Sequence, residues 1–297
     1  MRREVSEGDT GSLVSVVVPC FNQGQYLQPM LNSVSNACSF FHEVIVVDDG
    51  STDPLTLRFL DEILSPSAHQ SVRVLRQKNR GLSAARNAGA DASQLKYIQF
   101  LDADDMLAGN KIDRQVRLLE NDPSMTVHLT DYMFCDEEGS RFWSPYKSTL
   151  QGFDFSVRDF VAYWERGLSI PIHCALFRRE TISGIRFNEN LRAKEDWIFW
   201  ISLAVVGARL CYSPFVGAIY RQHENNMCKD GIAMAISWLK AWKLIRDSGI
   251  PIDGEDERSF LDHYNSYYVE LFTRQASTKP GYAGRYNNLN FLLSLGD

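Results

Sequence analysis

The sequence predicts an α/β fold in which helices flank a mostly parallel sheet. Short, nearly continuous apolar runs alternate with helical patterns between residues 13 and 120. Such runs are typical of strands that are covered on both faces, and the alternation favours a parallel sheet. Polar residues, among them Asn22, Asp48, Asn79 and Asp102, follow the apolar runs. Open α/β sheets bind ligands at the carboxyl ends of their strands, so a site is expected at this edge.

The elements follow from the spacing of apolar residues. Strands are expected at residues 13–18, 43–47, 72–76, 97–101, 125–134 and 171–177. Helices are expected at residues 24–39, 54–64, 82–94, 110–120 and 195–206. From about residue 231 the apolar residues have helical spacing, which predicts a helical C-terminal extension. We expect this extension to add no catalytic group, because no further acidic cluster follows a strand there.

Composition excludes several classes of protein. The hydrophobic fraction of 44% and the charged fraction of 23% are ordinary for a globular chain of 297 residues. The net charge of −6 argues against nucleic acid as the main partner. The six cysteines include no Cys-x-x-Cys pair, so we expect reduced thiols rather than a zinc site.

The location of the protein is inferred from the same composition. The N-terminus lacks the apolar segment of a signal peptide, and no run of 18 apolar residues occurs. We expect a cytoplasmic protein, with the inner face of the membrane as the alternative location. Lys240, Lys243 and Arg246 form only a weak basic set for peripheral membrane association. The oligomeric state stays open.

The stretch FLDADD, residues 100–105, crowds three carboxylates at the end of an expected strand. Two carboxylates about 4 Å apart repel each other by about 1–4 kcal/mol. A solvated turn that leads into a helix is one interpretation of this stretch. A divalent cation is the other, because Mg²⁺ and Mn²⁺ prefer hard oxygen ligands and would cancel the repulsion.

Two further motifs follow earlier strands. In VVDDGSTD, residues 46–53, a turn and a helix N-cap explain the last three residues but not Asp48 and Asp49. Carboxylates at that position can accept hydrogen bonds from a nucleobase or a ribose. In NRGLSAARNAGA, residues 79–90, Arg86 stands among small residues that allow close packing on the sheet. A salt bridge from Arg86 to Asp48, Asp49 or Asp102 is expected.

These motifs together resemble those of family 2 glycosyltransferases with the GT-A fold. VSVVVPCFNQGQYL, EVIVVDDGSTD, NRGLSAARNAGA and FLDADDML occur in the order and spacing of that family. The later segment FRRETISGIRFNENLRAKEDWIFW resembles its acceptor-side region, and YRQHENNM resembles its late Tyr-Arg-x-His element. The resemblance covers roughly residues 13–228. Cys20 and Gly109 depart from the commoner residues, but neither change removes a functional group.

The resemblance implies a role for each matching residue. The nucleotide would be bordered by Pro19, Phe21, Asn22, Asp48, Asp49, Asn79, Arg86 and Asp102. Asp48 and Asp49 would hold uracil and ribose if the donor is a UDP-sugar. Asp102 and Asp104 form the Asp-x-Asp motif, with Asp104 as the principal ligand of Mn²⁺ or Mg²⁺ and His223 as a further ligand. Asp105 is interpreted as structural, and His173 as core or acceptor-side packing.

The resemblance also implies a catalytic base and a division of the chain. Asp196 would be the general base of an inverting transfer, with Glu195 as the second candidate; the alternative is that a helix N-terminus simply favours acidic residues. Residues 1–12 would be a flexible N-terminus, 13–228 the catalytic domain and 229–297 the helical extension. Within the domain, residues 13–108 would bind the nucleotide sugar and 109–228 the acceptor.

The function expected from the resemblance is transfer of a sugar from a nucleotide-sugar donor to a hydroxyl of a glycan or lipid-linked glycan. A catalytically silent binding module on the same fold is the alternative, although such a module would not need Asp102, Asp104 and Asp196. A nucleotidyltransferase would want a basic, glycine-rich loop after the first strand, and CFNQGQYL has no basic residue.

Overall fold

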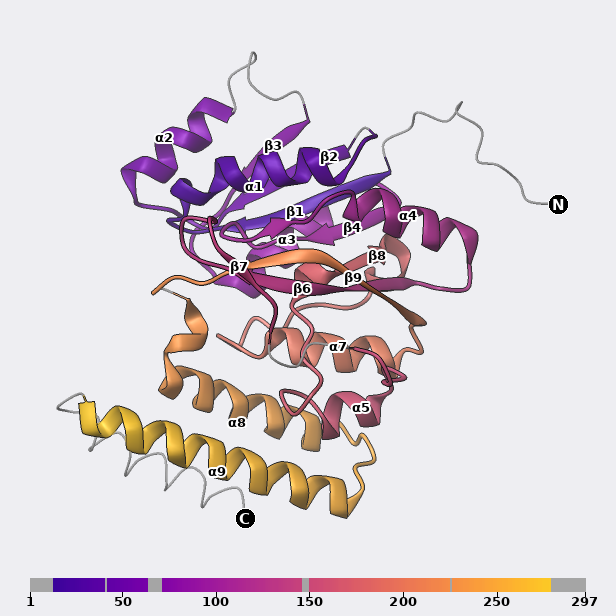
Figure 1. The fold of residues 1–297 in the computed structure, drawn as a ribbon, viewed down its shortest axis with the longest axis vertical. Coiled ribbons are helices and arrows are strands. Elements are labelled where there is room, and N and C mark those ends of the chain that lie inside the picture. Colours follow the sequence, from indigo (N-terminus) through magenta and orange to yellow (C-terminus); the bar gives the residue numbers. More distant parts are fainter. Residues whose placement is uncertain (1–12, 41, 64–70, 146–149, 225, 279–297) are drawn as a thin grey trace.

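A computed structural model describes residues 13–40, 42–63, 71–145, 150–224 and 226–278 (Figure 1). Their strands form one sheet in the order β3-β2-β1-β4-β8-β6-β9-β5, and β7 pairs with β6. The strands are β1 (Val14–Cys20), β2 (His42–Asp48), β3 (Val72–Arg76), β4 (Tyr97–Phe100), β5 (Met106–Leu107), β6 (Val127–Cys135), β7 (Phe142–Trp143), β8 (Ala175–Arg178) and β9 (Leu210–Arg221).

Helices cover both faces of this sheet. The α-helices are α1 (Gly24–Ala37), α2 (Pro54–Ile63), α3 (Leu82–Ala92), α4 (Lys111–Asn121), α5 (Val157–Ala162), α6 (Arg179–Ile182), α7 (Glu195–Val205), α8 (Gly231–Asp247) and α9 (Gly254–Thr278), with short 3-10 turns η1 (Ile172–Cys174) and η2 (Met227–Lys229). Figure 1 shows α8 and α9 beyond α7, on the side of the sheet away from α1.

The first four strands are parallel, as the sequence predicts. β1 lies between β2 and β4, and β2 pairs with β3. Every residue of β1 is buried because successive side chains enter two different cores. Val16 packs with Leu27 of α1 and Ile112 of α4, whereas Val17 faces the opposite core. This burial on both faces explains the continuous apolar run.

The second half of the sheet is mixed, which the sequence pattern does not show. β8 runs antiparallel to both β4 and β6, and β5 runs antiparallel to β9. The strand expected at 171–177 is partly wrong, because the 3-10 turn η1 precedes the short β8. This turn places His173 beside the end of β4 rather than within a strand.

Strand β9 has no counterpart in the sequence prediction. It pairs in parallel with β6 along its length, with a shift in register near Thr130 and Asp131. Its burial is irregular, and Pro214 and Gly217 interrupt its apolar residues, so neither a continuous run nor a clean alternation marks it. Its end nevertheless delivers Arg221 and His223 to the edge where β4 ends.

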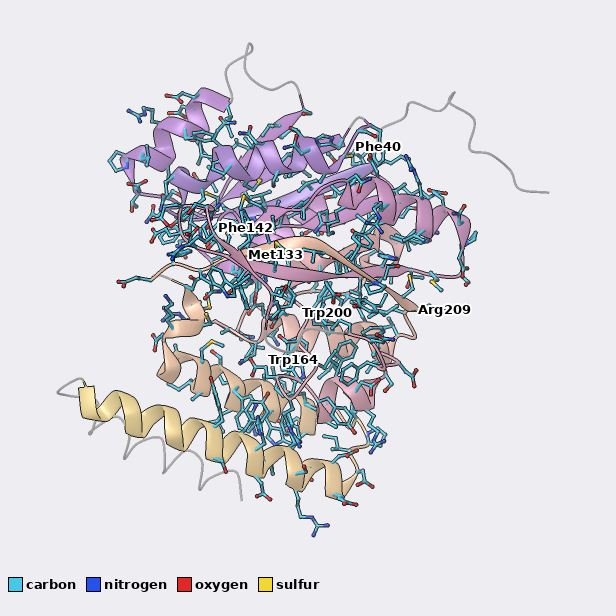
Figure 2. All side chains as sticks on the ribbon, viewed as in Figure 1. Phe40, Met133, Phe142, Trp164, Trp200 and Arg209 are labelled. Atoms are coloured by element: carbon cyan, nitrogen blue, oxygen red, sulfur yellow. The ribbon has the colours of Figure 1, made fainter. Side chains whose placement is uncertain are left out.

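The C-terminal helices are helical as predicted, but they share the main core. Trp238 on α8 and Phe260 on α9 belong to the same cluster of buried residues as Trp197 and Trp200 of α7. Trp164 and Trp200 lie between the sheet and α8 (Figure 2). The boundary near residue 228 therefore separates parts that pack as one body. None of the described helices is long and apolar enough to cross a membrane. Residues 1–12 and 279–297 lie outside the described residues.

Candidate active site

A cleft of about 1140 Å³ lies at the carboxyl ends of the central strands. The residues predicted from the sequence that line it are Pro19, Phe21, Asp49, Asn79, Arg86, Asp102, Asp104, Glu195 and Asp196. Asn22, Asp48 and His223 are not among the lining residues. Side chains from the two halves of the chain thus meet in one cleft, although they are separated by about a hundred residues in sequence.

A buried guanidinium joins the two halves. Arg86 Nη2 lies 2.6 Å from Asp102 Oδ1, and Arg86 Nη1 lies 2.7 Å from Glu195 Oε1. Of the three partners expected for Arg86, the structure selects Asp102. Both carboxylates need this cation, because removing one partner of a buried ion pair leaves the other charge uncompensated. Glu195 is therefore committed to a structural ion pair.

Asp104 is brought to His223 at the end of β9. Asp104 Oδ2 lies 2.9 Å from His223 Nε2. The ring of His223 is buried and stacks on Tyr26, with 5.2 Å between ring centroids, and its Nδ1 has no hydrogen-bond partner among the described residues. Arg221 fixes the contact, because its Nε donates to the carbonyl oxygen of Asp104 over 2.7 Å.

This donor pair fits a divalent cation. The carboxylate oxygen suits both Mn²⁺ and Mg²⁺, whereas the imidazole nitrogen favours a transition metal, so the pair fits Mn²⁺ better than Mg²⁺; the remaining ligands would come from water and substrate phosphates. Within the described ranges, no group of three His, Cys, Asp or Glu side chains is placed to hold a metal ion. Asp102 is turned towards Arg86, so its role as a metal ligand stays a prediction.

Behind the Asp-x-Asp motif lies a buried acid–imidazole pair. Asp105 Oδ2 lies 3.2 Å from His173 Nδ1, and Asp105 Oδ1 accepts a hydrogen bond from the backbone of Arg221. Burial raises the pKa of Asp105 well above its ordinary value, and the charge of Asp104 adds to this. Burial lowers the pKa of His173 to about 3. Asp105 thus ties the motif to β9 and η1, and His173 lines the cleft.

Asp196 differs from its neighbour Glu195. It lies in the first turn of α7, is partly exposed to the cleft, and accepts a hydrogen bond from the backbone N–H of Trp197 over 2.8 Å. Burial raises the pKa of Asp196 to about 7, as does the charge of Glu195, whereas Lys194 and Arg86 act in the opposite direction. In the described part of the chain Asp196 forms no ion pair, so it is the better placed of the two acids to exchange a proton.

Three residues predicted to contact the nucleotide form hydrogen bonds within the loops around the cleft, and their contact with a nucleotide stays a prediction. Asp49 accepts hydrogen bonds from Gln77 Nε2 and from the backbone N–H groups of Arg80 and Gly81, at 2.7 to 2.8 Å. Asp48 Oδ1 accepts from the backbone of Ser51, and Asn22 Oδ1 accepts from the backbones of Thr52 and Asp53. Only Asp49 of the three lines the cleft. Phe21 is 44% exposed and lies at its edge.

The sequence prediction missed several residues of the cleft. Tyr220 lines the cleft and Arg221 beside it binds the Asp104 carbonyl; both lie within the quoted motif YRQHENNM but had no role assigned. Lys194 and Glu165 form an ion pair at the cleft wall, and Met234 of α8 also lines it. A signal was present only for Tyr220 and Arg221, because the others are brought together by tertiary packing.

A strand-edge cleft with an Asp-x-Asp carboxylate beside an imidazole, and a separate acid from a later helix, agrees with the arrangement that the sequence resemblance implies for a glycosyltransferase. The model of the family described as "Glycosyl transferase family 2" matches residues 15–185. The chain belongs to this family. The matched region contains Asp102 and Asp104 but ends before Glu195, Asp196 and His223.

Two relatives are similar in sequence, and the first of them bears out the assignment. An uncharacterised glycosyltransferase from Haemophilus influenzae is 30% identical over 225 residues, which are 75% of this chain and 85% of the relative. An uncharacterised glycosyltransferase from Rickettsia bellii is 31% identical over 195 residues, which are 64% of this chain. The match spans only 26% of the Rickettsia protein's length.

Two solved structures share the fold. TarS from S. aureus in complex with UDP-GlcNAc has a TM-score of 0.63 at 18% identity and covers 90% of this chain and 76% of its own. A mannosyltransferase from Pyrobaculum calidifontis in complex with GDP-Man and Mn²⁺ has a TM-score of 0.59 at 18% identity, with coverage of 97% and 82%. At this identity the likeness shows the α/β fold, with its mixed, mostly parallel sheet flanked by helices.

Proposed function

We propose that the protein transfers a sugar from a UDP-sugar to a hydroxyl group of a glycan or glycolipid acceptor, with inversion at the anomeric carbon. The observation that carries this proposal is the meeting in one cleft of Asp104 and Asp196, with His223 paired to Asp104 behind the cleft wall. Nucleotide sugars bound to two proteins of the same fold, one of them with Mn²⁺, support a donor of this class.

The donor would lie along the strand ends. Pro19, Phe21 and Asn79 border the nucleoside end of the cleft, and Asp49 holds the loop of Arg80 and Gly81 against it. Asp104 and His223 would hold a divalent cation, which when bound supplies positive charge for the diphosphate. The ion pair of Arg86 with Asp102 keeps the Asp-x-Asp loop in place.

Asp196 would act on the acceptor. It accepts the proton of the acceptor hydroxyl while that oxygen forms a bond to the anomeric carbon, and the bond from that carbon to the diphosphate oxygen breaks on the opposite face. The nucleoside diphosphate leaves with the bonding electrons. A base works best when its pKa is near the operating pH, so a value of about 7 suits this step.

Binding of UDP is expected to depend on the metal. Without a cation, Asp102 and Asp104 repel the diphosphate. Calorimetric titration of UDP with Mn²⁺ present should give a Kd lower by about tenfold or more than the same titration in EDTA, equal to about 1.4 kcal/mol. Asp104→Asn should lose most of this gain, while Asp196→Asn keeps it. Equal affinity with Mn²⁺ and with EDTA would rule out the metal site.

Turnover is expected to depend on Asp196. Asp196→Asn keeps the shape of the side chain but cannot accept a proton, so turnover should fall by about 10²–10⁴ while the Kd for UDP stays within about twofold. The measurement is release of nucleoside diphosphate from a panel of UDP- and GDP-sugars. Near-normal turnover in this variant would make Glu195 the next residue to test. If no donor is turned over by the unchanged protein with any acceptor supplied, the silent binding module is favoured.

A further inference from the structure

The turn that precedes α7 is held by an unusual ion pair. Lys194 stands directly before α7 with a left-handed backbone, φ 66°, and its side chain is 4% exposed. It pairs with Glu165 Oε1, and Glu165 is also left-handed, with φ 55°. Positive φ is uncommon for residues other than glycine. Two such residues at one ion pair indicate that the surrounding structure imposes this geometry.

The second oxygen of Glu165 reaches the C-terminal helices. Tyr264 of α9 is buried, and its hydroxyl lies 3.1 Å from Glu165 Oε2 and 2.8 Å from the carbonyl oxygen of Trp164. A chain of side chains therefore runs from α9 through Glu165 to Lys194. Glu165 and Lys194 line the same cleft as Asp196.

We propose that Tyr264, Glu165 and Lys194 form a positioning chain through which α9 sets the orientation and charge state of Asp196. Among the described residues, the charged groups with the largest effect on the pKa of Asp196 are Glu195, Lys194 and Arg86. The guanidinium of Arg86 is fixed by its ion pairs with Asp102 and Glu195. The ammonium group of Lys194 pairs instead with Glu165, which α9 contacts through Tyr264, so α9 can change the position of this cation. Glu165 holds the ammonium group of Lys194 beside α7, and the hydroxyl of Tyr264, which is shared between the Trp164 carbonyl and the Glu165 carboxylate, holds the segment that carries Glu165.

The test follows the carboxyl group of Asp196 directly, in the full chain without ligand. The protein is labelled with ¹³C-aspartate, the carboxyl signals are titrated by NMR, and Asp196→Asn identifies the signal. Lys194→Met removes the positive charge and should raise the pKa of Asp196 by about one unit. Lys194→Arg should restore the original value. If Lys194→Met does not fold, Lys194→Gln makes the same comparison, because it also removes the charge.

A double-mutant cycle tests the link to α9. Tyr264→Phe frees Glu165, so the ammonium group is held less closely and the pKa of Asp196 should rise by a smaller amount. In the Lys194→Met background, Tyr264→Phe should not shift the pKa of Asp196 further, because the contact between Glu165 and Lys194 is already lost. Tyr163→Phe, which removes a hydroxyl outside the chain, should leave the titration unchanged. A pKa that does not move in Lys194→Met, or an equal Tyr264→Phe shift in both backgrounds, would overturn the proposal.

The proposal rests on the proposed function only where it calls Asp196 the base, and the two can fail separately. The same variants are assayed for turnover of the nucleotide sugar against pH. Below the pKa of the base, turnover falls as the pH falls. If the pH of this fall shifts together with the NMR titration, the positioning chain of Tyr264, Glu165 and Lys194 acts on the catalytic base. If the titration moves and the fall in turnover does not, the chain stands and the base assignment is wrong.

Discussion

The protonation of Asp196 sets a pH dependence for transfer. Its pKa is raised to about 7, first by burial and then by the charge of Glu195. Only the ionised carboxylate can accept a proton, so turnover should rise with pH up to about 7 and then level off. At one pH unit below the pKa, about a tenth of the molecules hold the active form. Turnover at saturating donor, measured from pH 5 to 9, should show this rise, which is the acid limb of the pH profile.

The control for this measurement is the affinity for UDP at each pH, which separates the base from the metal site. The residual turnover of Asp196→Asn should lack the limb, since its side chain does not titrate. A limb near pH 4 in the unchanged protein would show that Asp196 keeps the ordinary acidity of a carboxyl group, and would contradict the raised pKa.

At the scale of residues, the sequence indicated which side chains gather at the strand ends but not what each one does there. Asp48 and Asp49 are adjacent and alike, yet only Asp49 lines the cleft. Successive residues of an extended chain point in opposite directions, and at the end of β2 it is Asp49 that faces the cleft. Hydrogen bonds between distant segments, such as that from the Arg80 backbone to Asp49, leave no local signal.

At the scale of elements, α3 carries the basic side of the cleft, and its position depends on one glycine. A Cβ atom added at Gly89 would lie 2.3 Å from Val17 Cγ1 and 3.2 Å from Val47 Cγ2. Valine side chains in strands cannot swing away. Gly89→Ala should therefore push α3 off β1 and β2 and destabilise the protein by about 1–3 kcal/mol. Urea unfolding followed by circular dichroism measures the loss.

The matched control is Gly184→Ala, because an added Cβ there meets nothing within 4 Å. It should change the free energy of unfolding by no more than about 0.5 kcal/mol. The shift of α3 should also displace Arg86, so the UDP affinity of Gly89→Ala should fall. If Gly89→Ala is as stable as the control, the helix has room that the structure does not show.

Whether a strand could be predicted from the sequence depends on how it is buried. β1, β2 and β4 are buried on both faces along most of their length, so their apolar runs identify them from local sequence alone; β3 is a partly buried edge strand. β9 is a strand because it pairs with β6. Its buried residues do not alternate regularly with exposed ones, so its sequence shows no strand periodicity. The direction of a strand also cannot be predicted from its apolar run. The run of β8 predicts a strand, but not that the strand is antiparallel to β4 and β6.

At the scale of the whole molecule, the C-terminal helices are part of the core that supports the site. Trp238 and Trp242 of α8 and Phe260 and Tyr264 of α9 are buried together with Trp197 of α7. The centroids of the Trp197 and Phe260 rings are 5.5 Å apart. The amphipathic pattern of this segment showed that it would pack against something. It did not show that its partner is the helix that carries Asp196.

A chain that ends after residue 230 tests this arrangement. The four buried aromatic side chains that it loses contribute about 6–12 kcal/mol, at about 1.5–3 kcal/mol each. A folded domain is stable by only about 5–15 kcal/mol in total. We therefore expect the shortened protein to lose its cooperative thermal transition, to bind a hydrophobic dye, and to bind UDP weakly or not at all. A chain that ends after residue 278 keeps every described residue of α9 and serves as the control. A sharp transition and normal UDP binding in the chain ending at residue 230 would mean that residues 13–228 fold alone, and that the aromatic contacts beneath α7 add little to the site.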